Sequence, residues 1–256
     1  GRVIGAGGAG RPLYPRTAAT TQWFQGFSST YHALQAKLDR KFKSGLQLTT
    51  AFTWQKAMAF QSGDDGGLLF YVGMNRNYAR ADFDRTYSLT QSYLYQLPLG
   101  KGQLWLHSGI PAAVVGGWQL SGVLSETTGT PMSVTANSAA LNLPGTTQTA
   151  DQVAAVEILH GINVGNPWFS TSSFKQPVGA VFGTSGKNIF DGPGLFNLNL
   201  SLFRIVSIRE SIKLELRGEA INATNTPQFA NPNTNLTTGT FGYVTATRSS
   251  GAGVNG

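Results

Sequence analysis

Strict alternation between apolar and polar residues is the feature that most constrains the fold of this chain. Between Gly192 and Phe229 it forms two runs, separated by a short turn at about 207–211. Successive side chains leave opposite faces of a β-strand, so this pattern predicts an antiparallel hairpin with one apolar and one polar face. The apolar face is predicted to carry Leu198, Leu200, Leu214 and Leu216, and the polar face Asn197, Asn199, Lys213, Glu215 and Arg217.

The same alternation appears near the start of the chain, in segments 31–42 and 46–56. A tight turn at Lys43-Ser44-Gly45 separates them and predicts a second hairpin. Its apolar face is predicted to carry Leu34, Leu38 and Phe52, and its polar face Gln35 and Lys37.

Weaker alternation predicts more strands at 85–97, 103–107, 115–127, 132–135 and 241–247. Segment 136–191 is predicted to be a long loop region whose one helical candidate is 151–160, where apolar residues recur every three positions. The chain is therefore predicted to be all-β, an antiparallel up-and-down meander of about eight to ten strands with little helix.

Two kinds of β protein fit this pattern. In a soluble sandwich the apolar faces pack inward, whereas in an outer-membrane barrel they face lipid and the polar faces line the lumen. Charged residues make up 12% of the chain, about half the usual share of soluble domains. Short turns that alternate with long loops, and aromatic residues towards strand ends, are typical of membrane barrels. The pattern favours the barrel, and the sandwich stays open as the alternative.

No motif in the sequence indicates a cofactor, a metal or a catalytic centre. The glycine-rich segment Gly5–Gly10 lacks the preceding strand and following helix of a dinucleotide site, and Ser185–Asn188 lacks key residues of a phosphate loop. The three histidines are far apart in sequence and cysteine is absent. We therefore predict no cofactor, no metal site and no enzymatic activity.

The distribution of basic residues and the spacing of the carboxylates argue against two further functions, nucleic-acid binding and glycosidase activity. The net charge is +7, but the basic residues are scattered, so no nucleic-acid partner is predicted. Glu215 and Glu219 lie four residues apart on one predicted strand, which separates them by ~13 Å, too far for either glycosidase geometry. With Arg217 between them, they are predicted to form a charge ladder facing the lumen.

Six segments of the chain carry a resemblance to a known family. They are YHALQAKLDRKFKSGLQLTTAFTWQKAM (31–58), ADFDRTYSLTQSYLYQLPLG (81–100), GWQLSGVLSETTGTPMSV (117–134), WFSTSSF (168–174), FGTSGKNIFDGPGLFNLNLSLFR (182–204) and LELRGEAINATNTPQFANPN (214–233). In the same order, they resemble the C-terminal part of the Oar-like TonB-dependent receptors, which are outer-membrane barrels. Asn199 stands where members of that family often carry Asp, and the family's closing strand has no counterpart.

The resemblance implies that residues 1–256 are part of a receptor barrel in the bacterial outer membrane, without its N-terminal plug, its front strands or its closing strand. It also implies energy-coupled uptake of a scarce, unidentified solute, with membrane lipid as one partner and the TonB complex, acting through the missing plug, as another. A structural, adhesive or passive barrel whose extracellular loops bind ligands is the alternative. As a fragment, the chain is expected to keep open strand edges and to aggregate without detergent.

Overall fold

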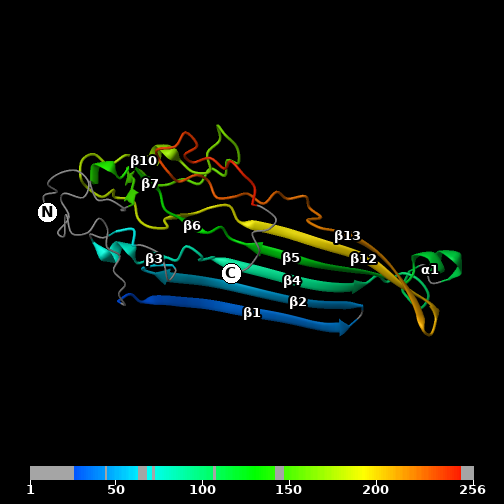
Figure 1. Cartoon of the computed structure of the whole chain (residues 1–256). Helices are drawn as coiled ribbons and strands as arrows, with labels where there is room; N and C mark the ends of the chain where they lie inside the picture. The colour runs from blue at the N-terminus through cyan, green and yellow to red at the C-terminus, as the bar shows by residue number, and fades with distance from the viewer. Residues whose placement is uncertain are drawn as a thin grey trace.

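The fold was analysed in a computed structural model that describes residues 26–43, 45–62, 68–70, 73–105, 108–141 and 147–248. A long, curved sheet dominates it, and irregular chain gathers at one end of that sheet (Figure 1). No helix among these residues is long and apolar enough to cross a membrane.

Neighbouring strands of the main sheet are all antiparallel, in the order β1-β2-β4-β5-β12-β13, with the short β3 paired to the end of β2. The order follows the chain, which confirms the predicted up-and-down meander. The strands are β1 (Ser29–Lys43), β2 (Leu46–Ala59), β3 (Ala79–Arg80), β4 (Tyr87–Gln96), β5 (Trp118–Thr127), β12 (Leu195–Arg209) and β13 (Ile212–Ala220).

Six long strands form this meander in the described part of the chain, fewer than the eight to ten expected. In the predicted strand 103–107, Trp105 makes only a bridge to Leu99, and His107 lies outside the described residues. The predicted strand 241–247 is likewise reduced to isolated bridges that involve Phe241 and Thr247. In both places the backbone pairs with nearby loop segments, so local alternation overstated the number of strands.

The two ends of the sheet differ in their connections. At the turn end, β1 meets β2 and β12 meets β13 in tight hairpins, and segment 97–117 connects β4 to β5. Gly45, in the first hairpin, has a φ of 77°, which glycine adopts without strain. Segments 60–86 and 128–194 lie at the opposite, loop end (Figure 1). The predicted alternation of short and long connections is thus present, but segment 97–117 is a long connection at the turn end.

That connection contains α1 (Gly109–Val115), a helix that the alternation did not indicate. Two backbone hydrogen bonds fold the preceding residues back on themselves, from the amide of Gly100 to the carbonyl of Trp105 and from the amide of Trp105 to the carbonyl of Pro98. A Cβ atom on Gly100 would lie 2.4 Å from the Cα of Gly116, so the two glycines let these backbone segments approach closely.

The described residues leave both faces of the main sheet largely open. Among the described residues of the six long strands, only Ala57 and Ala59 are buried, and both lie at the loop end of β2. A sandwich would bury one face of each strand against a second sheet about 10 Å away. The described residues instead form a single-layer sheet, as in the wall of a barrel.

The buried core lies at the loop end instead. It consists of Met132, Val134, Ala150, Trp168, Phe169, Phe174, Phe190 and Val244. The short elements here are η2 (Met74–Asn77), β6 (Pro131–Met132), β7 (Thr135–Ala136), η3 (Ala139–Leu141), β8 (Gln148–Thr149), β9 (Asp151–Gln152), η4 (Thr171–Ser173), β10 (Phe174–Lys175) and β11 (Phe190–Asp191). We call segments 131–192 and 226–248 the loop module; much of the predicted loop region 136–191 contributes to it.

The predicted helix at 151–160 is wrong. Asp151 and Gln152 form β9, which pairs with β10. Beyond it, the amide of Val153 donates to the carbonyl of Ser173 and the amide of Leu159 to that of Trp168. Val153 and Leu159 are exposed, so their spacing does not mark a buried helical stripe. Pairing with residues more distant in sequence overrode the local pattern.

Candidate functional site

The register of the main sheet determines which side chains share a face, because directly paired residues in antiparallel strands point the same way. Leu34 pairs with Trp54, which pairs with Tyr87, and Leu198 pairs with Leu124, which pairs with Gln91. All seven residues predicted to face lipid fall on this face, which we call the apolar face: Leu34, Leu38, Phe52, Leu198, Leu200, Leu214 and Leu216. That the apolar face meets lipid stays a prediction.

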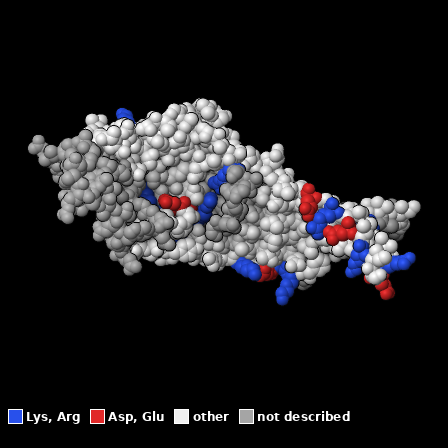
Figure 2. All heavy atoms as spheres, viewed as in Figure 1, with Lys and Arg blue, Asp and Glu red and all other residues white. Residues whose placement is uncertain are grey.

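All seven residues predicted to face the lumen fall on the opposite face, which we call the polar face. They are Gln35, Lys37, Asn197, Asn199, Lys213, Glu215 and Arg217. On the four inner strands β2, β4, β5 and β12, this face carries hydroxyl, amide and some apolar side chains, and no charged one. Charged side chains gather over β1 and β13, at the two edges of the sheet (Figure 2).

The charges on β13 form the predicted ladder. Arg217 Nε lies 2.7 Å from Glu215 Oε1, and Arg217 Nη1 lies 3.2 Å from Glu219 Oε1. The guanidinium also stacks over the ring of Phe203 on β12, 5.3 Å from its centre. The three charged side chains are well exposed, and exposed ion pairs stabilise a fold little. The ladder therefore supplies a fixed pattern of alternating charge on the polar face rather than stability.

Asn199 has a structural role that its predicted place on the polar face did not indicate. Its Oδ1 accepts a hydrogen bond of 2.9 Å from the backbone amide of Asn222, where the chain leaves β13. Asn222 has a φ of 50°, and its side chain is bonded to the backbone of Thr226. The carboxylate of an Asp at this position could accept the same bond.

A shallow groove of about 420 Å³ crosses the strands β4, β5, β12 and β13 near this turn. Its polar lining comes from Ser92, Ser121, Asn199, Ser201 and Glu219. The hydroxyl of Ser201 is buried and has no hydrogen-bond partner among the described residues. The groove is thus lined by hydroxyl, amide and carboxylate groups on the polar side of the sheet.

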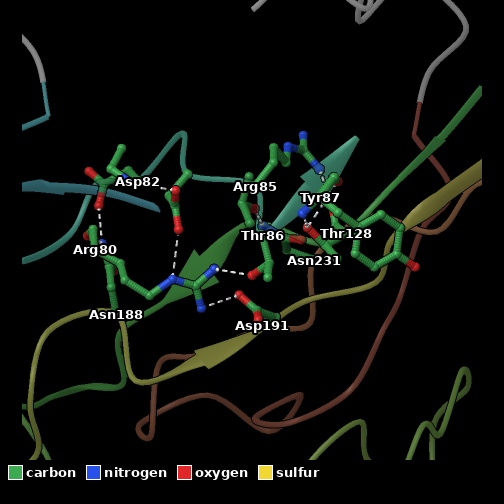
Figure 3. Close-up of polar contacts among 12 residues, drawn as sticks. Arg80, Asp82, Arg85, Thr86, Tyr87, Thr128, Asn188, Asp191 and Asn231 are labelled. Carbon is green, nitrogen blue, oxygen red and sulfur yellow. Dashed lines mark hydrogen bonds and ion pairs between the residues drawn. The ribbon is translucent and has the colours of Figure 1, made fainter. Parts of the chain in front are cut away.

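A network of charged residues around the buried Asp84 lies at the loop end, at the base of the loop module (Figure 3). Asp84 is 1% exposed and accepts bonds from the amide of Ala57, at 2.7 Å, and from Arg80 Nε, at 2.8 Å. Arg80 Nη1 also lies 2.8 Å from Asp191 Oδ1, on β11. Desolvation lowers the pKa of Arg80, but its bonds to Asp191 and Asp84 outweigh this and hold the pKa above the ordinary value. The network ties β2 and β3 to the loop module.

Polar side chains extend this network on both sides. Asn188 Nδ2 donates to the carbonyl of Arg80 and to Asp82 Oδ1, both at 2.6 Å. On the other side, Arg85 Nη1 donates to the carbonyl of Thr128 at 2.6 Å. Burial lowers the pKa of Arg85, and the positive charge of Arg248 lowers it further. Sequence reasoning assigned no role to this cluster, although Arg80, Asp82, Asp84 and Arg85 crowd into six residues of a chain poor in charge.

The other motifs and histidines singled out in the sequence, where the structure describes them, make structural contacts or lie exposed. Lys187 donates to the carbonyl of Phe60, and burial lowers its pKa. Its side chain is therefore used in a contact within the protein, as in a turn rather than a phosphate loop. His32 is exposed on β1, and His160 packs edge-on against Trp168. The glycine-rich segment 5–10 lies outside the described residues. Within the described ranges, no three His, Asp or Glu side chains are grouped so that they could hold a metal ion.

Comparison with known proteins agrees with this geometry. Residues 3–252 match the family described as outer membrane beta barrel domain, which is nearly the whole chain. Neither the curated proteins nor the solved structures give a match. With its single-layer antiparallel sheet, the chain belongs to the outer membrane beta barrel domain family and to the bacterial outer membrane, where it associates with lipid.

Proposed function

We propose that this barrel domain is part of a TonB-dependent receptor that takes up a scarce solute with energy from the inner membrane. The observation that carries the proposal is the ordered resemblance of six segments to the Oar-like receptors, which the family assignment supports at the level of the barrel. The two-faced, single-layer sheet suits the wall of such a barrel.

Two features of the structure are consistent with a receptor. The polar face of the four inner strands offers hydroxyl and amide groups that can contact a polar solute or a plug without holding it by charge. The loop module is folded around its own aromatic core, so the loop end presents a defined surface for capture. No catalytic role is part of the proposal.

The test measures uptake and its dependence on energy. Cells with and without the gene are grown in a defined mixture of solutes, and the solutes that only the parent strain depletes are identified. We expect depletion to stop when TonB is deleted or the proton motive force is collapsed with a protonophore. Depletion that persists under both treatments would contradict energy coupling.

A passive or adhesive barrel is the second candidate, and the folded loop module favours it as much as it favours a receptor. Planar-bilayer recordings of the whole protein in potassium chloride separate the two. A receptor closed by a plug is expected to give no steady conductance, whereas an open passive barrel gives stable, ohmic channels.

A further inference from the structure

The connection between β4 and β5 displays large apolar side chains at the turn end of the sheet. The exposed fractions are 80% for Leu104, 68% for Trp105, 80% for Ile110 and 62% for Val114. Ile110 and Val114 are four residues apart, so they project from the same side of α1. In water, these four side chains would leave a large apolar area without cover.

Backbone contacts hold this connection in place. The paired amides and carbonyls around Gly100 and Trp105, together with the close packing of Gly100 on Gly116, determine how the apolar side chains are displayed. At the helix end, Arg204 Nη1 donates to the carbonyl of Val114 at 2.6 Å. The exposed side chains therefore belong to a folded element.

The same contact joins α1 to the apolar face of the sheet. Arg204 pairs with Trp118 on one side and Leu216 on the other, so it lies on the apolar face near the turn end. Because its guanidinium reaches the last turn of α1, the helix lies next to the turn end of that face. In Figure 1, α1 lies beside the ends of the strands.

We propose that α1 and the Leu104–Trp105 segment form an interfacial anchor that inserts into the phospholipid headgroup layer of the periplasmic leaflet. Short connections of outer-membrane barrels lie on the periplasmic side, which places the turn end there. Tryptophan is enriched at that depth, and the exposed Lys101 in the same connection can meet lipid phosphates. The proposal rests on the sheet spanning the membrane with its apolar face to lipid, and is independent of solute uptake.

The test uses single cysteines introduced into residues 1–256, which contain none. Ile110→Cys and Val114→Cys carry a nitroxide in the whole protein, reconstituted into vesicles of phosphatidylethanolamine and phosphatidylglycerol. The relaxation of each label is compared in the presence of oxygen, which concentrates in lipid, and of a water-soluble nickel complex. We expect oxygen to be the stronger relaxant at both sites, which would lie about 5–10 Å into the boundary between headgroups and acyl chains.

Glu210→Cys is the matched control, because it is exposed in the hairpin at the same end of the sheet. Its label is expected to respond mainly to the nickel complex. The anchor is refuted if the labels on α1 behave like this control. Shielding from both relaxants, or spin–spin broadening between two labelled copies, would also overturn it in favour of a protein partner or a second copy. A failure of energy-coupled uptake leaves these readings unchanged.

Discussion

The ring of Tyr93 on β4 covers the backbone of Gly122 on β5, its direct partner on the apolar face. A Cβ atom at position 122 would lie 2.7 Å from the Tyr93 hydroxyl and 2.7 Å from the carbonyl of Asn199. Both distances are shorter than real Cβ atoms show, so glycine at position 122 is what allows the Tyr93 ring to lie across the backbone of β5. Such cross-strand cover compensates for the missing side chain of a strand glycine.

Gly122→Ala is therefore expected to destabilise the sheet by about 1–3 kcal/mol, the usual cost of overpacking. The measurement is the free energy of unfolding by guanidinium in lipid vesicles. Gly218→Ala is the matched control, because Gly218 lies on the same face with nothing within 4 Å of its Cβ position. Equal effects at the two glycines would show that the contact with Tyr93 does not matter.

Leu200→Arg tests which face meets lipid. If Leu200 lies near the membrane midplane, the substitution should cost ~2–4 kcal/mol in the same unfolding assay. Asn197→Arg, on the polar face of the same strand, should be far better tolerated because that side chain has access to water. If Leu200→Arg leaves the free energy of unfolding unchanged, or if Asn197→Arg lowers it more, the assignment of the two faces would be reversed.

Asp84→Asn tests the network of charged residues at the loop end. The amide cannot supply the charge that Arg80 binds, and we expect a loss of about 1.5–3 kcal/mol, typical of hydrogen bonds to charged groups. Glu219→Gln, in the exposed ladder on β13, should leave the unfolding free energy unchanged within error. In Asp84→Asn, the backbone amides of segment 79–86 and β11 should be the first to lose protection from hydrogen exchange. Protection there as in the wild type would contradict the role of the network.

Lys187 should make stability depend on pH in the alkaline range. Burial holds its folded-state pKa below the unfolded value, so below the folded pKa the buried charge costs stability in full. As the pH rises towards 10.5, the unfolded chain binds more protons at this site and the cost is relieved. The wild type should therefore gain stability relative to Lys187→Met between pH 7 and 10.5. A difference between the two that does not change with pH would exclude this effect, and Lys101→Met controls for the loss of one positive charge.

Without detergent, the chain should aggregate. Both faces of its long sheet are open, one of them is apolar, and β1 and β13 end the sheet without a further partner among the described residues. Size-exclusion chromatography with and without detergent tests this expectation. A sharp monomer peak in water, with cooperative unfolding, would mean that the apolar face is buried as the core of a soluble protein.

The sequence by itself determined the parts of the fold that depend on local alternation. A side-chain period of two allows only two assignments of faces, so the segregation of Leu198 and Leu200 from Asn197 and Asn199 could be predicted before any pairing was known. The charge ladder around Arg217 followed from the same rule, because residues two apart on a strand are neighbours on one face.

Only the tertiary structure decided what lies between the long strands. The network of charged residues joins Arg80, Asp84 and Asp191, residues separated by up to 111 positions, through the meeting of β3 with β11. The false helix at 151–160 and the missed helix α1 both depend on contacts that local periodicity does not contain. Val153 and Leu159 pair with Ser173 and Trp168, and α1 is fixed by the approach of Gly116 to Gly100 and by the bond from Arg204 to Val114. Alternation specifies the faces of a strand, whereas loops owe their structure to packing between residues distant in sequence.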